Sequence, residues 1–172
     1  YVLNALLENG RADVAYRMVT QPDQPGWLWW RAQGATTLWE QWTGAESRNH
    51  IMFGDVSAWF YKALGGIRPD PRAPGFQHFE VRPEPPTDLN WARADYDSIR
   101  GHIASHWERQ DGRFRLRVTI PANATATVYL PGSAQADVRE SGNDVRTVKE
   151  VRFLRQEGDR VVFDVGSGSY DF

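Results

Sequence analysis

Cysteine is absent from the 172-residue chain. Disulfide scaffolds, thiol nucleophiles and cysteine-based metal sites are therefore excluded, and the sequence does not indicate a redox compartment. No apolar run reaches the roughly 18 residues that a membrane-spanning helix needs. The net charge is only -2, so the chain lacks the strong positive charge that is typical of nucleic-acid binders. These absences predict that neither a membrane nor a nucleic acid is a partner.

Several functional motifs are also missing. The chain has no phosphate-binding loop, no dinucleotide-binding glycine motif and no serine-hydrolase elbow. His102 and His106 form an i,i+4 pair, but they fall in an expected strand and would lie too far apart for one ion. We therefore expect no metal site. The chain begins at Tyr1 in a helical pattern, so we expect it to be part of a longer polypeptide, whether cytoplasmic, periplasmic or secreted.

Aromatic residues, by contrast, are plentiful around one acid, Glu40. Five of the eight tryptophans lie between positions 27 and 42, namely Trp27, Trp29, Trp30, Trp39 and Trp42. A carboxylate among indoles fits a sugar-cleaving site, because flat rings stack on pyranose C–H faces and the acid moves protons at the anomeric centre. Tryptophan is also largely buried on average, so a packed core is the competing interpretation.

The N-terminal part of the chain has the apolar spacing of helices. Apolar residues recur at intervals of three and four over 11–20 and 55–64, which is typical of amphipathic helices. A helix end at residues 1–7 stops before Asn9-Gly10. The Gly-, Pro- and Trp-rich stretch 22–35 is expected to be a loop. Helices joined by tight turns are the units of helical hairpins and α/α barrels.

Six prolines between positions 69 and 86 end the helical pattern, since proline interrupts a helix. Beyond them the apolar period becomes two, and turn signals separate short segments, which predicts an antiparallel β-sandwich. The expected strands are 91–96, 101–107, 113–120, 126–130, 151–154 and 160–165. We place a helical domain at 1–79, including a packed proline-rich connector, and the β-sandwich at 80–172.

Two features of the expected sandwich have plain structural interpretations. The strand 113–119 alternates arginine with apolar residues, which indicates one face exposed to water. Trp91 and Trp107 each lie in a strand pattern, so we expect both in the core. A sugar-binding surface on the sandwich is disfavoured for that reason.

Four segments resemble the C-terminal end of bacterial α-L-rhamnosidases of the inverting type. Residues 34–42, Gly-Ala-Thr-Thr-Leu-Trp-Glu-Gln-Trp, resemble the general-base motif of that family. Residues 47–54, Ser-Arg-Asn-His-Ile-Met-Phe-Gly, resemble its Asn-His motif and the start of its last barrel helix. Residues 74–83 resemble the connector, and 91–103 the first hairpin, of the C-terminal domain. The resemblance spans nearly the whole chain, and its first two segments are the most specific.

The resemblance implies the last helices of an (α/α)6 barrel followed by a β-sandwich, with no cofactor. Glu40 would be the general base that activates water, and His50 would contact the rhamnose. Trp29, Trp30 and Trp39 are the candidate sugar contacts. The implied substrates are terminal α-L-rhamnosides, that is, rhamnose-containing glycosides.

An inverting enzyme needs two carboxyl groups about 6.5–9.5 Å apart, one acid and one base. The acidic segment that carries the family's general acid has no counterpart here, so we expect the remainder of the barrel as a partner and the chain alone to be inactive. Two alternatives remain open from the residues: a non-catalytic carbohydrate-binding module, and a sandwich with a purely structural role.

Overall fold

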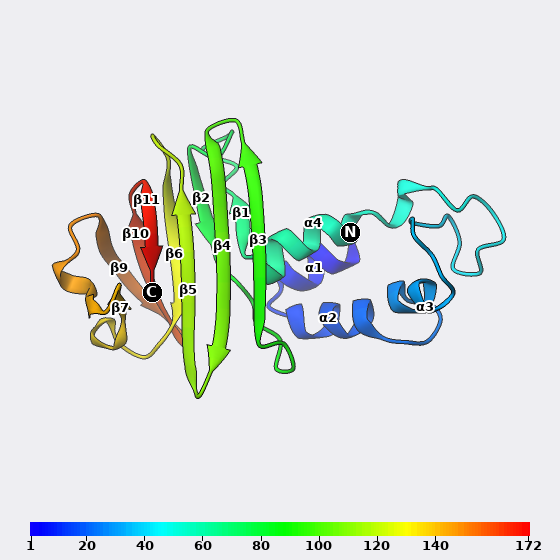
Figure 1. Cartoon of the computed structure of the whole chain (residues 1–172), viewed down its shortest axis with the longest axis horizontal. Coiled ribbons are helices and arrows are strands. Elements are labelled where there is room, and N and C mark those ends of the chain that lie inside the picture. The colour runs from blue at the N-terminus through cyan, green and yellow to red at the C-terminus, as the bar shows by residue number, and fades with distance from the viewer. The chain divides into compact units, whose positions relative to one another are not determined.

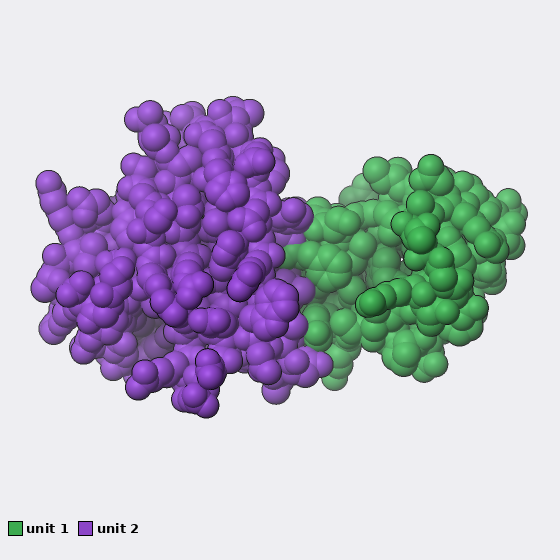
Figure 2. Space-filling model, viewed as in Figure 1, with its two compact units in different colours: residues 1–60 green, residues 61–172 purple.

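Short helices build the N-terminal unit, Tyr1–Phe60, in the computed structural model, which describes all residues 1–172 (Figures 1 and 2). Its elements are α1 (Val2–Glu8), α2 (Ala12–Thr20), α3 (Trp27–Ala32), a 3-10 turn η1 (Ile51–Phe53) and α4 (Asp55–Trp59). The helices expected at the start of the chain and over 11–20 are confirmed. The helix expected over 55–64 begins at Asp55 as predicted, but its second half is a π-helical turn, η2 (Phe60–Leu64).

The packing of α1 against α2 and α4 follows the apolar spacing. The inward residues are Leu3 and Leu7 of α1, Ala15 and Val19 of α2, and Val56 and Trp59 of α4. Asn4 of α1 donates from Nδ2 to both carboxylate oxygens of Asp55, at 3.0 and 2.9 Å. Asp55 is the first residue of α4, so its charge lies at the positive end of that helix while it also ties the helix to α1.

The stretch 22–35 is not the continuous loop that its composition predicts. Residues 27–32 form α3, which follows the extended residue Gly26. Six residues are too few for a stable isolated helix, so tertiary packing must hold it. The buried ring of Trp30 provides that packing, which a count of glycine and proline does not reveal.

Two sheets form the second unit, Tyr61–Phe172, and all six expected strands are confirmed (Figure 1). One sheet has the order β1 (Ile67–Pro69), β2 (His78–Val81), β6 (Thr125–Pro131), β10 (Arg160–Val165), β9 (Val151–Glu157). The other has the order β11 (Gly168–Asp171), β5 (Arg113–Ile120), β4 (Gly101–Gln110), β3 (Trp91–Ser98). A small hairpin, β7 (Arg139–Glu140) and β8 (Asn143–Asp144), and the 3-10 turns η3 (Gln135–Asp137) and η4 (Val145–Thr147) complete the unit.

The proline-rich connector belongs to the sandwich in the structure. Its residues supply β1 and β2, and β2 pairs in parallel with β6, the one parallel pair in the two sheets. Phe79 and Val81 of β2 are fully buried. The compact units consequently divide at 60/61, whereas the sequence expectation placed the change of domain at 79/80.

Both sheets contribute to one apolar core. It includes Ile103, Trp107 and Leu116 from one sheet, and Val128 and Phe163 from the other. Trp107 is buried as expected, stacks on Phe114 at 5.7 Å between ring centroids and donates from Nε1 to the carbonyl of Leu64 at 2.7 Å. Its fixed ring joins the chain before β1 to β4.

Trp91 lies outside this core, and the expectation that it is buried is wrong. It is 61% exposed, while Ala94 on the same strand is 8% exposed. Side chains alternate along a strand, so Trp91 shares the outward face of β3 with Arg93 and Asp95. The strand is at the edge of its sheet, and its inward positions are taken by Ala92, Ala94 and Tyr96.

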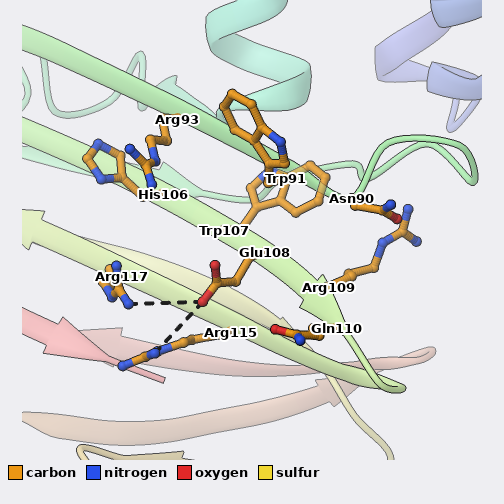
Figure 3. Close-up of a pocket in the computed structure, with 10 residues that line it drawn as sticks. All are labelled: Asn90, Trp91, Arg93, His106, Trp107, Glu108, Arg109, Gln110, Arg115 and Arg117. Atoms are coloured by element: carbon orange, nitrogen blue, oxygen red, sulfur yellow. Dashed lines mark ion pairs between the residues drawn. The ribbon is translucent and has the colours of Figure 1, made fainter.

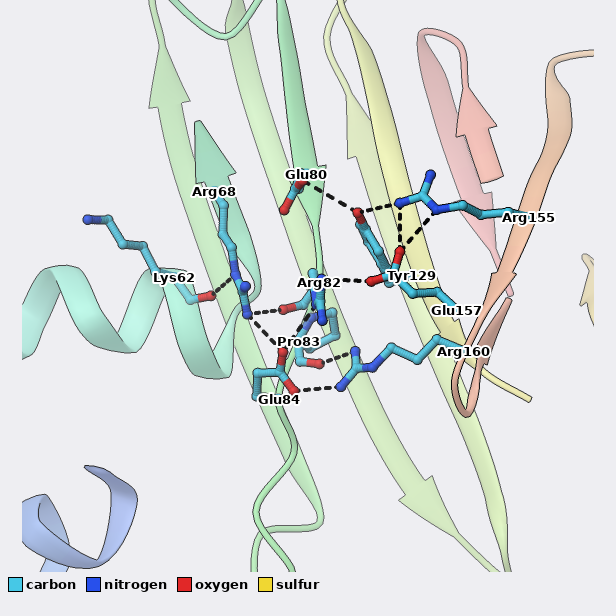
Figure 4. Close-up of polar contacts among 10 residues, drawn as sticks. All are labelled: Lys62, Arg68, Glu80, Arg82, Pro83, Glu84, Tyr129, Arg155, Glu157 and Arg160. Atoms are coloured by element: carbon cyan, nitrogen blue, oxygen red, sulfur yellow. Dashed lines mark hydrogen bonds and ion pairs between the residues drawn. The ribbon is translucent and has the colours of Figure 1, made fainter. Parts of the chain in front are cut away.

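A network of ion pairs holds the segment after β2 against the first sheet (Figure 4). Glu84 is at its centre: its Oε1 lies 3.0 Å from Arg68 and its Oε2 lies 2.6 Å from Arg160. Arg82 reaches Glu84 at 3.3 Å and also Glu157 at 3.3 Å. These side chains are mostly buried, and burial is the main cause that lowers the pKa of Arg68. The Glu84 carboxylate thus pairs with three arginines, which come from β1, from the segment after β2 and from β10.

The helices are too short and too polar to cross a lipid bilayer.

Candidate functional site

A loop between residues 37 and 50 holds both candidate site residues, Glu40 and His50. Two backbone contacts close it: His50 N–H donates to the carbonyl of Leu38 at 2.8 Å, and Glu40 N–H donates to the carbonyl of Ser47 at 2.8 Å. Thr37 adds a hydrogen bond from its hydroxyl to the carbonyl of Arg48. The two candidate residues therefore lie on facing arms of one closed loop.

An aromatic cluster packs beside the loop. Its rings belong to Trp27, Trp30, Trp39, Trp42 and Phe53. Trp30 lies 4.4 Å from Trp42 between ring centroids, and Trp42 lies 4.4 Å from Phe53. Trp30 also donates from Nε1 to the carbonyl of Trp42 at 3.1 Å, so this polar edge is satisfied inside the cluster. The cluster ties α3 to the arms of the loop.

Trp39 fixes the loop from within. Its ring is 5% exposed, with Arg48 over one face at 4.8 Å from the guanidinium carbon to the ring centroid. Gly44 lies against the same indole, and a Cβ at that position would come within 2.6 Å of Trp39 Cζ3. Gly44 also has a φ of +71°, which other residues adopt at a cost. Only glycine therefore allows the loop to close tightly on Trp39.

Glu40 follows this anchor directly and is half-buried. Its Oε2 accepts a hydrogen bond from the backbone N–H of Ser47 at 3.3 Å. Its Oε1 accepts no hydrogen bond from the protein, so that oxygen is available to a water molecule. A carboxylate held at one oxygen and open at the other has the form that a general base requires.

The ring of His50 is oriented by the next turn. Its Nδ1 accepts a hydrogen bond from the backbone N–H of Met52 at 3.1 Å, where the 3-10 turn η1 begins. In the neutral ring an acceptor Nδ1 places the proton on Nε2. His50 can therefore donate from Nε2 to an oxygen acceptor such as a sugar hydroxyl.

The three candidate tryptophans differ in exposure. Trp30 and Trp39 are 2% and 5% exposed, so each is packed on both faces and supports the loop from inside the cluster. Trp29 is half-buried and takes part in none of the cluster's ring contacts. Of the three, only Trp29 has accessible ring surface.

Three residues that shape the loop were given no role from the sequence: Gly44, which lies between the two motifs, and Ser47 and Arg48, which begin the second motif. The signal that could have found Gly44 is its position between Trp42 and Glu46 in a segment of polar residues, which is typical of a tight turn. Nothing in the sequence indicates the contact of Arg48 with Trp39, because it depends on the closed form of the loop.

The histidine pair of the second unit is arranged as the strand pattern predicts. His102 and His106 share the outer face of β4, and Asp95 bridges them at 3.2 and 2.9 Å. A hydrogen bond to Asp97 is the main cause that raises the pKa of His102. No three His, Asp or Glu side chains in the chain are placed so as to hold a metal ion.

Comparison with known proteins places both units in one family. Residues 1–64 match the sequence model of the bacterial alpha-L-rhamnosidase 6 hairpin glycosidase domain. Residues 66–144 match that of the bacterial alpha-L-rhamnosidase C-terminal domain. The expected fold class, helices of a six-hairpin barrel followed by a β domain, is thereby confirmed.

Individual relatives agree with these matches. The chain is 33% identical to an alpha-L-rhamnosidase of Streptomyces avermitilis over 99% of its own length and 17% of that protein. The crystal structure of a Streptomyces avermitilis alpha-L-rhamnosidase complexed with L-rhamnose superposes with a TM-score of 0.87 at 32% identity, covering 99% of this chain and 17% of that one. The structure of the alpha-L-rhamnosidase from Dictyoglumus thermophilum superposes with a TM-score of 0.85 at 34% identity, and the match covers 100% of this chain and 20% of that one.

The chain thus spans about a fifth of the length of the relatives that it matches. Within that span the likeness covers the helical unit and the sandwich alike. The chain belongs to the bacterial α-L-rhamnosidase family, in which it corresponds to part of the six-hairpin glycosidase domain together with the C-terminal domain.

Proposed function

We propose that this chain forms part of a glycoside hydrolase that cleaves terminal α-L-rhamnosides with inversion, and that Glu40 is its general base. The observation that carries the proposal is the state of the Glu40 carboxylate: Oε2 is held by the backbone of Ser47 while Oε1 is unpaired. Membership of the rhamnosidase family supports the reaction class.

The chemistry asked of Glu40 is the activation of one water molecule. Its Oε1 would accept a proton from a water on the far side of the anomeric carbon, and the oxygen of that water would form the new bond as the glycosidic bond breaks. The proton taken by Glu40 returns to solvent after the product leaves. The hydrogen bond from Ser47 fixes the carboxylate, because a base must keep its direction through the reaction.

His50 and Trp29 are the proposed sugar contacts. His50 donates from Nε2 to a rhamnose hydroxyl, with Nδ1 fixed by Met52. The half-buried ring of Trp29 offers a face to the C–H groups of the sugar. Trp30 and Trp39 support the Glu40 loop from inside the aromatic cluster and do not contact the sugar, because their burial leaves no ring face open for stacking.

The general acid is proposed to come from outside this chain, in the remainder of the barrel. It would protonate the leaving oxygen while Glu40 acts on the opposite face of the sugar. One carboxylate cannot serve both faces of the same anomeric carbon in a single displacement. The 172-residue chain alone should therefore show no turnover of an aryl α-L-rhamnoside.

The test uses the complete enzyme with Glu40→Gln. The amide keeps the shape of the side chain and accepts no proton, so kcat should fall by about 10²–10⁴ while KM changes little. Glu46→Gln is the matched control, because Glu46 is an exposed acid of the same loop. Proton NMR of the first product should show β-L-rhamnose from the unmodified enzyme. Near-normal kcat in Glu40→Gln removes Glu40 from the base role, and an α-configured first product contradicts inversion.

A further inference from the structure

The Trp91 ring is the feature of the sandwich that its packing does not explain. At 61% exposure it is the one exposed tryptophan of the eight in the chain. Hydrophobic side chains can be exposed singly without a role, so the surroundings of the ring decide. The contact that covers part of it comes from Arg93, whose guanidinium carbon lies 5.8 Å from the ring centroid.

A shallow hollow of about 380 Å³ lies beside Trp91 along β3, β4 and β5, and the buried Trp107 is among its lining residues (Figure 3). Its size is within the usual range of small-ligand sites. In Figure 3 the Trp91 ring projects from β3, and Glu108 stands on the neighbouring strand, opposite Trp91 in the strand register. Planar polar groups of arginine, histidine and glutamine complete the lining. The hollow therefore combines one flat apolar surface with many hydrogen-bonding groups.

Positive charge exceeds negative charge in this hollow. Its lining includes four arginines, Arg93, Arg109, Arg115 and Arg117, and one acid, Glu108. Arg115 and Arg117 are already engaged, since both lie within 4.0 Å of Glu108 and both reach Asp171.

Arg93 and Arg109 differ from that pair because neither has a carboxylate partner. Arg109 donates to main-chain carbonyls, at 2.6 Å to Leu89 and also to Pro86, so its charge is fixed in place and not neutralised. Guanidinium groups that have no carboxylate partner within the protein favour a ligand that carries carboxylates.

We propose that this Trp91 surface is a second, non-catalytic binding site of the protein, and that its ligand is an acidic glycan bearing uronate residues. Trp91 stacks on the C–H face of one pyranose ring. Arg93 and Arg109 pair with uronate carboxylates, and Glu108 accepts from hydroxyl groups. The site is independent of Glu40, because all its residues belong to the sandwich.

A single-stranded nucleic acid also combines flat rings with negative charge, but the surface fits it less well. The hollow offers one exposed aromatic ring, whereas nucleic-acid surfaces stack successive bases on several.

The test is calorimetric titration of the whole 172-residue chain with tetragalacturonate, with the neutral β-1,4-galactotetraose and octathymidylate in parallel. We expect tetragalacturonate to bind with a Kd of about 1 mM or tighter. The binding should weaken as salt is raised, because the contacts are exposed. Trp91→Ala should weaken it about tenfold, or ~1.4 kcal/mol. Arg93→Gln should weaken it by a smaller factor.

Three controls keep the test decisive. Arg152→Gln removes an exposed arginine of the other sheet, which pairs with Asp164, and should leave the binding unchanged. Glu40→Gln should also leave it unchanged, which separates this site from the proposed base. Circular dichroism should show Trp91→Ala to be folded. The proposal is overturned by the absence of binding at about 10 mM, by equal binding of the neutral glycan, by tighter binding of the oligonucleotide, or by full affinity in Trp91→Ala.

Discussion

In the helical unit Trp30 and Trp39 are almost wholly buried and contact other rings, whereas in the sandwich Trp91 projects into solvent beside arginines. The first region is rich in indoles and uses them to fix a loop. The second has a single exposed indole, which lies beside Arg93, an arginine without a carboxylate partner. The clustered tryptophans thus pack beside the loop of Glu40, whereas the isolated Trp91 leaves its ring open to solvent.

This difference also changes how the two regions should respond to substitution. Removal of a packed ring leaves a cavity and lost contacts, so stability falls. Removal of an exposed ring leaves the core intact, so only binding should change. Three experiments test the two regions, from the largest expected effect to the smallest.

The largest effect is expected when the buried and exposed tryptophans of the sandwich are each changed to alanine. Trp107→Ala removes a ring that stacks on Phe114 and bonds Leu64, and should cost about 3–5 kcal/mol of unfolding free energy. Trp91→Ala should stay within about 0.5 kcal/mol. Urea unfolding followed by circular dichroism measures both. A loss of several kcal/mol in Trp91→Ala would mean that this ring is structural, and the contrast would fail.

A middle effect is expected for Gly44→Ala in the helical unit. The new Cβ would meet Trp39 at 2.6 Å, and φ at this position is +71°, so the loop must open or strain at a cost of about 1–3 kcal/mol. In the complete enzyme kcat should fall because Glu40 is carried on the same loop. Gly34→Ala is the matched control: its φ is also positive, at +80°, but nothing lies near its added Cβ. Equal effects of the two changes would exclude the Trp39 contact as the cause.

The smallest effect is expected for the pKa of His102, which lies on the same sheet face as Trp91. The hydrogen bond to Asp97 is the main cause of the raised pKa of His102, and Asp95 adds to it. With a folded pKa above the unfolded value near 6.5, the contribution to stability is fully present below that value and is lost as pH rises through the folded pKa. Asp97→Asn should move the NMR titration midpoint of His102 downward. Asp88→Asn, an exposed acid of the same unit, should leave it in place, and no movement in Asp97→Asn would contradict the contact.

The periodicity of the sequence predicted much of the fold, because each expected strand has one apolar face. It missed α3, whose six residues depend on the burial of Trp30, and it missed β1 and β2, which lie among prolines that indicate a connector. The exposure of Trp91 could have been predicted from side-chain alternation, because the charged residues Arg93 and Asp95 lie on the same face of the strand. Tryptophan's average preference for the interior outweighed that signal.

The candidate site shows a similar limit. Glu40 and His50 could be named as candidates because they stand in two short motifs. The state of the Glu40 carboxylate could not, since the contact with Ser47 exists only in the closed loop. Local motifs identify which residue types are present, whereas the availability of each atom depends on contacts between residues several positions apart.

The closed loop has a consequence for how the family can diversify. The cross-links between Leu38 and His50 and between Glu40 and Ser47 lie at its base, and Gly44 is held against Trp39, so Ala45 and Glu46 are exposed beyond these ties. Residues inserted there would extend outward without altering the spacing of Glu40 and His50. The length of this segment can therefore vary while Glu40 and His50, the proposed base and sugar contact, keep their positions.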